Sequence, residues 1–342
     1  MCRPSGWIGT AFLFYWVLCI TRFAAAEPPD LAALEAKPLY EFTEAEVDAY
    51  LAHLQAAESD LRKRVLHLAR KNIGQPYDIY LLGEMPFETH DPQPIYCLTK
   101  SDCVVFSEHT YAMALSGDWP AFMKLLQRIR YRDGQIGVAT RNHYTEADWN
   151  RSNRWLVRDV TAELAGDAAV AFEERIDRAK FLKNRYGLTV DIPVETHRDV
   201  YLPCAEIERA TPHLADGDFV NVVRGTVKQG NVKPDAPPAE VVAGSAFVGH
   251  VGLVTHGDDG QLHMIHSTPP AVREEPLDAY IARALADAAE KDAAGKPRLV
   301  GFKFLRLEQR PLENLRRLDG DDAPVIHLPL DDASGFWRAR LR

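Results

Sequence analysis

The sequence has one long apolar run and no excess of basic charge. The run covers residues 7–20, and no second stretch of that kind follows it. Acidic residues outnumber lysines and arginines by 49 to 40, for a formal net charge of −9 at pH 7. An acidic balance argues against a nucleic-acid partner, which would require clustered basic side chains. The absence of a second apolar run argues against an integral membrane span in the mature chain.

The apolar run fits an export signal. Arg3 supplies a positive start, and Ala24-Ala25-Ala26 is a small-residue cleavage site before Glu27. We therefore expect residues 1–26 to be a signal peptide cleaved after Ala26, and the mature protein to be periplasmic or secreted. Leu18 before Cys19 argues against a lipoprotein anchor, because such signals need a small residue there.

Three cysteines remain after the predicted cleavage: Cys97, Cys103 and Cys204. An odd number leaves at least one thiol unpaired unless another chain contributes. A Cys97–Cys204 disulfide would leave Cys103 free in an oxidising compartment. The alternative is that Cys97 and Cys204 are two small buried thiols.

Helical patterns dominate the first half of the chain and strand patterns the second, which indicates an α+β fold. Residues 27–42 are expected to be a linker, and 43–59 an N-terminal helix with a capping box at Thr43 and Glu46. A main domain at 60–310 and an extension at 311–342 follow. Within that domain we expect an exposed helix at 168–186, strands at 219–223, 247–255, 262–266 and 299–307, and a helix at 277–293.

Cys103 stands where a helix should begin. Thr99, Ser101 and Asp102 are capping residue types, and residues 104–115 are apolar enough for a buried helix. The positive end of a helix dipole lowers the pKa of a thiol and favours the nucleophilic thiolate. The pattern therefore predicts a nucleophilic cysteine with a lowered pKa.

Two histidines lie on strands joined by a strong turn signal at 256–260. If strand pairing centres near residue 258, His250 falls opposite residue 266 or 267, where Cβ atoms lie about 5 Å apart. His250 would then take the proton of Cys103, and His266 would hold the His250 ring in its working tautomer. His263 would lie too far along the hairpin for that role.

A zinc-dependent hydrolase is a competing hypothesis, because the chain also carries His143, His256 and His263. However, the sequence contains no His-Glu-x-x-His motif or similar ligand spacing. We therefore predict no metal and no organic cofactor.

These residues resemble the NlpC-type papain-like cell-wall peptidases. Gly74-Gln75-Pro76-Tyr77 is similar to their Gly-x-Pro-Tyr segment, Asp102-Cys103 to their Asp-Cys, and His250-Val251-Gly252 to their His-x-Gly. The chain resembles more closely, over about residues 60–307, a subgroup linked to N-acetylmuramoyl-L-alanine amidase activity and long catalogued as a domain of unknown function. Its motifs here are 80–84, 101–103, 129–132, 141–144, 148–149, 160–161 and 217–218.

The sequence departs from the peptidase relatives at three places. Val104-Val105 follows Asp-Cys where the peptidases have Ser-Gly. The gap from His250 to His266 is longer than usual, and residues 226–245 add length before the first histidine strand.

The resemblance implies a papain-like fold, with the cysteine helix packed on an antiparallel sheet that carries the histidines. It implies peptidoglycan fragments as substrate and a Cys103–His250–His266 mechanism that cleaves the amide between N-acetylmuramic acid and L-alanine. Alternatives are a D-glutamyl-diaminopimelate endopeptidase of the same fold and a non-catalytic wall-binding protein.

Several further residues are candidates for contact with the substrate. Tyr77 would line the rim, Asp102 would bind a polar group or serve as the helix cap, and Trp149 would stack on a sugar or be buried. Glu84 would bind a polar sugar or peptide group, or be a solvated loop acid. The donor-rich segment at 141–144 would bind carboxylates and sugars, or be a structural loop. The candidates are Tyr77, Glu84, Asp102, Arg141, Asn142, His143 and Trp149.

Overall fold

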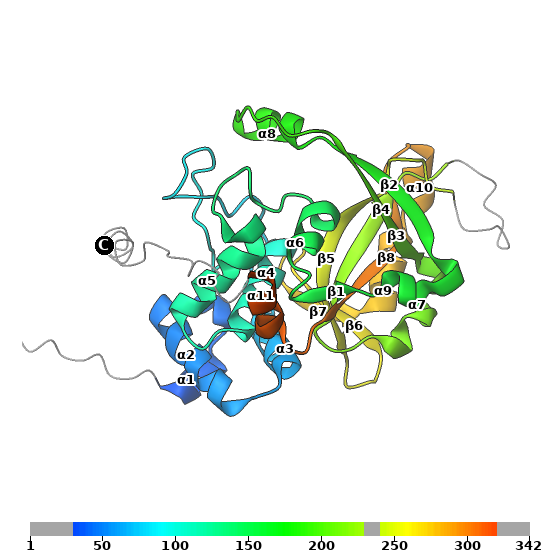
Figure 1. Ribbon diagram of the computed structural model, residues 1–342. Helices are drawn as coiled ribbons and strands as arrows, with labels where there is room; N and C mark the ends of the chain where they lie inside the picture. The colour runs from blue at the N-terminus through cyan, green and yellow to red at the C-terminus, as the bar shows by residue number, and fades with distance from the viewer. Residues whose placement is uncertain (1–29, 229–239, 320–342) are drawn as a thin grey trace, which may run out of the picture.

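The structure is a computed structural model that describes residues 30–228 and 240–319. Helices fill the first half of the chain, in the blue to cyan part of Figure 1. Side-chain caps start α2, α3, α4 and α5, as the sequence predicts for Thr43 and its capping box with Glu46. These helices are α1 (Leu31–Ala36), α2 (Glu44–Ala57), α3 (Leu61–Lys71), α4 (Cys103–Ala114) and α5 (Trp119–Arg130).

An antiparallel sheet fills the second half of the chain. Its eight strands run in the order β2-β3-β8-β4-β5-β6-β7, with β1 also paired to β8. The mixed architecture confirms the predicted α+β class. The strands are β1 (Val157–Asp159), β2 (Val170–Ile176), β3 (Glu195–Pro203), β4 (Phe219–Gly225), β5 (Phe247–His256), β6 (Leu262–His266), β7 (Arg273–Pro276) and β8 (Arg298–Leu307).

Both faces of the sheet are covered. Phe106 of α4 belongs to the same buried cluster as Val251 of β5 and Ile265 of β6. On the other face, Tyr280 of α9 (Leu277–Leu285) lies in a second cluster with Val254 and Met264. This packing brings α4 and α9 to opposite faces of the β5–β6 hairpin.

Three predicted elements differ from the structure. The expected helix at 168–186 is strand β2 followed by α8 (Arg178–Tyr186), because residues 170–176 pair along their whole length with β3. The expected helix at 277–293 is divided into α9 and α10 (Ala288–Ala293). The expected linker contains α1, and Leu34, Leu39 and Phe42 join the main core cluster.

Residues 170–203 form an arm in which β2 and β3 pair and α8 lies at the tip (Figure 1). The tip packs on the segment before the first strands. Phe181 of α8 meets the His143 ring edge-on at a centroid distance of 4.9 Å. Arg185 lies over the exposed Tyr80 ring at 4.0 Å. The sequence of α8 alone does not predict these contacts, because they involve residues far away in the chain.

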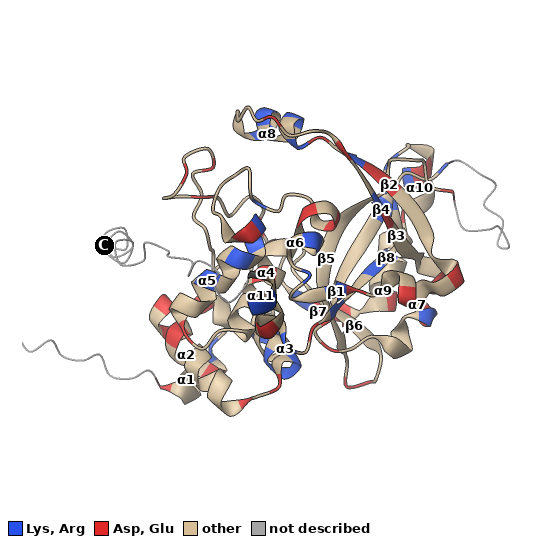
Figure 2. Cartoon of the chain, in the orientation of Figure 1, with Lys and Arg blue, Asp and Glu red and all other residues tan. Residues whose placement is uncertain are grey.

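The remaining helical elements are short or terminal: α6 (Asn150–Ser152), α7 (Thr161–Ala165) and α11 (Pro311–Asp319), with a π-helix at Thr145–Trp149. None of the helices between residues 30 and 319 that the structure describes is long and apolar enough to cross a bilayer. Figure 2 shows lysines and arginines distributed over several helices beside acidic residues. The predicted signal peptide lies outside the described residues.

Candidate active site

Cys103 is the first residue of α4. Asp102 caps this helix, and its Oδ1 accepts from the backbone N–H groups of Val104 and Val105 at 2.9 and 2.8 Å. The helix-cap interpretation of Asp102 is therefore confirmed. Cys103 is partly exposed, and its sulfur lies within hydrogen-bonding range of the backbone N–H of Val251, the residue after His250. The fold thus brings the start of α4 to the histidine strand.

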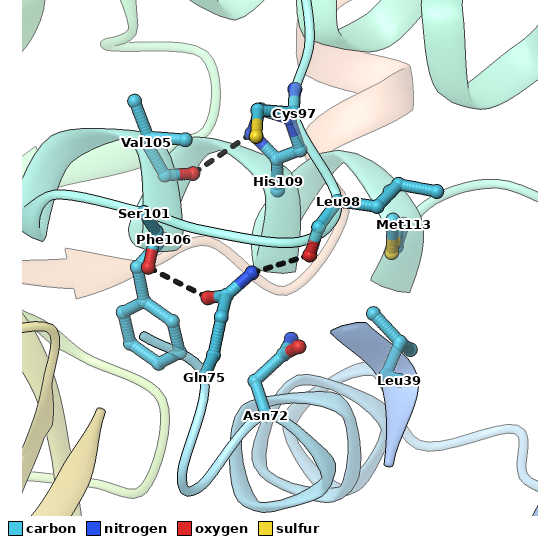
Figure 3. Close-up of a pocket in the computed structure, with 10 residues that line it drawn as sticks. All are labelled: Leu39, Asn72, Gln75, Cys97, Leu98, Ser101, Val105, Phe106, His109 and Met113. Atoms are coloured by element: carbon cyan, nitrogen blue, oxygen red, sulfur yellow. Dashed lines mark hydrogen bonds between the residues drawn. The ribbon is translucent and has the colours of Figure 1, made fainter. Parts of the chain in front are cut away.

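A pair of serines ties the cysteine segment to the end of β6. Ser267 Oγ donates to the backbone carbonyl of Ser101 at 2.8 Å. Ser101 Oγ donates to Gln75 Oε1 at 2.6 Å, and Gln75 Nε2 donates to the carbonyl of Leu98, also at 2.6 Å. Figure 3 shows Gln75 bridging the chain on either side of the turn before α4. These bonds hold the residues before Cys103 against the residue that follows His266.

The electrostatics of the thiol differ from the prediction. Burial, and secondarily the Asp102 carboxylate, raise the pKa of Cys103 to about 12. The expected lowering of this pKa by the helix start is therefore wrong for the free protein. The N–H groups that would stabilise a thiolate are outweighed by the loss of solvent. The resting site holds a neutral thiol.

His250 and His266 form a hydrogen-bonded chain with an acid. His250 Nε2 lies 2.7 Å from His266 Nδ1, and His266 Nε2 lies 2.7 Å from Glu275 Oε1. Arg273 Nε and one nitrogen of Arg283 donate to the same Glu275 oxygen at 3.1 and 2.7 Å. His266 and Glu275 are brought together by the pairing of β6 with β7.

The charge on Glu275 fixes the tautomers of this chain. Hydrogen bonds from Arg283 and His266 lower the pKa of Glu275 to about 2, so its carboxylate only accepts. His266 Nε2 must then carry the hydrogen. Burial lowers the pKa of His266 to about 4, so the ring is neutral and its Nδ1 accepts. His250 Nε2 must therefore donate, which leaves the lone pair on His250 Nδ1.

His250 is itself neutral at rest. Burial first, and then the charges around His266 and Arg224, lower the pKa of His250 to about 3. A neutral imidazole can act as a general base, because its free ring nitrogen can accept a proton.

The two histidines meet along a diagonal of the hairpin. Leu253 pairs with Ile265, so the pairing centres one residue later than expected and His266 lies opposite Gly252. His250 is two residues further along, within reach of a ring on the neighbouring strand. The predicted contact between the rings exists even though the predicted register is wrong.

Tyr280 and Arg224 complete the surroundings of His250, and the sequence analysis did not identify either one. The Tyr280 ring stacks on His250 at a centroid distance of 6.3 Å and meets His266 edge-on at 5.6 Å. Arg224 donates a hydrogen bond to the Tyr280 hydroxyl. A negative charge on Cys103 would raise the pKa of that hydroxyl. No local motif marks either residue, because α9 and the end of β4 reach the site only through the fold.

Tyr77 lies on the cysteine side of the site. Tyr77 is partly exposed, and its backbone forms an isolated β-bridge with Ser101. A negative charge on Cys103 would act on the Tyr77 hydroxyl. Burial and those neighbouring negative charges raise the pKa of Tyr77, so the hydroxyl stays protonated as a donor. The position suits the predicted role at the rim.

Glu84 and Arg141 pair with each other. Glu84 is fully buried, and its carboxylate accepts from Arg141 Nε at 2.7 Å and from Tyr131 at 3.1 Å. Arg141 also pairs with Asp91 at 2.8 Å. Glu84 has no exposed surface, which corrects the prediction that it contacts the substrate, whereas Arg141 also lines a cavity and its contact with a substrate stays a prediction.

Trp149 is also structural. It is 1% exposed, and its Nε1 donates to the buried Glu108 at 3.0 Å. No face of the indole is free to stack on a sugar, so that prediction is corrected and the buried alternative holds.

Asn142 and His143 line a cavity of about 270 Å³ beneath the arm. Their polar groups have protein partners: Asn142 Nδ2 donates to the Ile129 carbonyl, and His143 Nε2 lies 2.7 Å from the Val138 carbonyl. Burial lowers the pKa of His143 to about 3. The contact of this segment with a substrate stays a prediction.

The other cysteines and histidines have separate surroundings. Cys97 and Cys204 are free thiols, so the optional disulfide is not formed. His256 pairs with Asp216, and His263 lies between Asp259 and Glu274. Across the described ranges, no group of three or more His, Cys, Asp or Glu side chains is arranged to hold a metal ion.

Solved structures share this fold. A protein of Legionella pneumophila assigned to the DUF1460 family is similar at a TM-score of 0.62 and 17% identity, over 81% of this chain and 97% of its own. An N-acetylmuramoyl-L-alanine amidase of Bacteroides uniformis is similar at 0.51 and 23% identity, over 72% and 99%. No curated protein matches the chain.

The fold and the family relationship together define an amidase-like hydrolase. The chain belongs to the AmiA-like family, described as N-acetylmuramoyl-L-alanine amidase-like, whose model matches residues 67–285.

Proposed function

We propose that the protein hydrolyses the amide bond between N-acetylmuramic acid and L-alanine in peptidoglycan fragments, with Cys103 as the nucleophile. The observation that carries the proposal is the hydrogen-bonded chain from Glu275 through His266 to His250, one residue before Val251, whose backbone N–H hydrogen-bonds the Cys103 sulfur. Membership of an amidase-like family supports the choice of bond. Export through the predicted signal peptide would deliver the enzyme to this substrate.

The reaction begins with the neutral thiol and the neutral imidazole. His250 Nδ1 removes the Cys103 proton as the sulfur attacks the lactyl carbonyl carbon. The negative charge that develops on the carbonyl oxygen is stabilised by backbone N–H groups at the start of α4, including that of Cys103.

Collapse of this intermediate breaks the carbon–nitrogen bond. The His250 imidazolium gives its proton to the L-alanine nitrogen, which leaves as an amine, and a thioester remains on Cys103. His250 then takes a proton from water, and the hydroxide attacks the thioester carbonyl. The sugar acid leaves, and the thiol is protonated again.

His266 acts through His250. It keeps the His250 ring oriented, and its acceptor Nδ1 stabilises the imidazolium formed during each proton transfer. Glu275 and its arginines hold His266 in that tautomer.

The test is digestion of defined muropeptides with identification of the products by mass, comparing wild type with Cys103→Ser. We expect wild type to release the free sugar and a peptide that begins with L-alanine. The Cys103→Ser variant should lose about 10³-fold or more of the activity. Cys97→Ser and Cys204→Ser are matched controls that should retain it.

Three results would contradict the proposal. A surviving sugar–L-alanine–D-glutamate product would assign the enzyme to the endopeptidase class. Unchanged turnover in Cys103→Ser would exclude the thiol mechanism, and binding without turnover in wild type would indicate a wall-binding protein.

A further inference from the structure

Arg224 differs from three other buried or partly buried arginines of the chain. Arg130 pairs with Glu108, Arg141 with Glu84 and Asp91, and Arg178 with Asp148 and Glu195. Within residues 30–228 and 240–319, no carboxylate lies within 4.0 Å of the Arg224 guanidinium. Its Nε is buried and has no hydrogen-bond partner. The guanidinium hydrogen-bonds Tyr280 but has no carboxylate partner, so an anionic group of a ligand could still pair with it.

The position of Arg224 relates it to the proposed base. Arg224 lies near the end of β4, and its charge acts on His250. It donates a hydrogen bond to the hydroxyl of Tyr280, whose ring stacks on His250. The unpaired cation is therefore next to the histidine, on the side of the histidine hairpin covered by α9.

Gly249 provides the path for this side chain. A Cβ at Gly249 would lie 2.6 Å from Arg224 Cδ and 3.1 Å from its Nε. Only a glycine there lets the arginine lie across β5 immediately before His250. Arg224 on β4 and Gly249 on β5 together make this position of the guanidinium possible.

We propose that Arg224 binds a carboxylate on the peptide that leaves the enzyme when the amide is cleaved. This inference rests on the proposed function, in which His250 protonates the amine of that peptide. A group near His250 is then near the peptide side of the scissile bond. The planar guanidinium pairs with carboxylates through two parallel hydrogen bonds, which a neutral amide reproduces poorly.

The net negative charge of the protein makes a positive side chain at the site favourable for binding an anionic peptide. The chain carries a formal net charge of −9, which repels anionic peptides. One unpaired arginine at the site would offset this repulsion where the substrate is held. It would also favour substrates with a free carboxylate over those in which that group is amidated.

The experiment uses two substrates that differ by one charge: N-acetylmuramoyl-L-alanyl-D-glutamate and the same compound with its α-carboxylate amidated. We expect wild type to prefer the free acid in kcat/KM. Arg224→Gln should reduce this preference by about 10- to 100-fold, as expected for a lost hydrogen bond between charged groups. Arg224→Lys should retain part of it, because the charge remains without the planar fork.

Gly249→Ala tests the same contact without removing a charge. The added methyl group would displace Arg224, so the preference for the free acid should fall in this variant too. Arg209→Gln is the matched control. It removes one exposed arginine, paired with Glu206 and Asp167, and should leave the preference unchanged.

Binding of both compounds to Cys103→Ser, measured by calorimetry with and without Arg224→Gln, separates this inference from the proposed function. A preference for the acid in binding that depends on Arg224 supports the carboxylate site even if neither compound is cleaved. Cleavage of both compounds with equal losses in Arg224→Gln would overturn the inference and leave the amidase proposal intact. Binding without an Arg224-dependent preference would overturn it as well.

Discussion

The histidine hairpin and the Arg141 segment are both dense in polar side chains, but their hydrogen bonds end in different places. In the hairpin, the chain of bonds from Glu275 ends at His250, which is half-buried and has a ring nitrogen without a protein partner among the described residues. In the Arg141 segment, the bonds end on Glu84, Asp91 and the Val138 carbonyl. Residue type alone therefore does not distinguish a reactive site from a structural network.

The difference has an energetic basis. A buried network whose members are all paired contributes rigidity, and breaking it leaves an unpaired charge. A network with one open position can accept a reacting group. Mutations in the hairpin should therefore affect catalysis, whereas mutations in the Arg141 segment should affect stability.

The largest expected effect on activity in this comparison is that of His266→Ala. Without the His266 acceptor, His250 Nε2–H loses its partner and the ring is no longer held in its working tautomer. We expect kcat/KM on a muropeptide to fall by about 10³-fold. A loss below about tenfold would mean that His266 does not orient His250.

Arg141→Met should lower the stability of the protein and leave its activity nearly unchanged. It leaves the fully buried Glu84 without its cation, so the free energy of unfolding should fall by about 3–5 kcal/mol. Urea denaturation measures this change, and kcat/KM of the folded protein should stay near wild type. Adding Glu84→Gln should restore part of the stability. A specific loss of activity at unchanged stability would return Arg141 to the substrate site.

A smaller effect on activity is expected for Glu275→Gln. The amide can present an N–H to His266 Nε2, which would reverse the tautomers of both rings. We expect a decrease in kcat/KM of about 10- to 100-fold. Glu275→Asp is the conservative comparison and should lose less. Equal losses in the two variants would point to a packing role for this side chain.

The smallest effect concerns pH. His143 has its pKa lowered from 6.5 to about 3 by burial, so the unfolded chain binds its proton at higher pH than the folded one. The stability from this group is present above pH 6.5 and is lost as pH falls toward 3. His143→Phe should therefore flatten the loss of unfolding free energy between about pH 6.5 and 4. Parallel curves for the variant and wild type would contradict the shifted pKa.

Local signals predicted several elements of the fold. Capping residues at Thr43 and Asp102 mark helix starts that the structure confirms. The turn between β5 and β6 marks the hairpin, and β6 has the predicted bounds. These features depend on residues within a few positions of each other, so a single sequence contains enough information to identify them.

Features that depend on distant partners were missed or misplaced. The β2 pattern reads as helical until β3 pairs with it. Glu275 has no motif of its own, and its role arises from the pairing of β7 with β6. The thiol pKa was predicted from the helix start alone, whereas burial by the surrounding fold dominates it. Arg224 and Tyr280 likewise gain significance only from their neighbours.

The bond between Ser267 and Ser101 joins residues 166 positions apart in the chain. Contacts of such long range form late, because the intervening chain must be ordered before they close. A nascent or half-assembled polypeptide would therefore hold the thiol and the imidazoles apart. We therefore expect the hydrolase to become active only after the whole domain has folded.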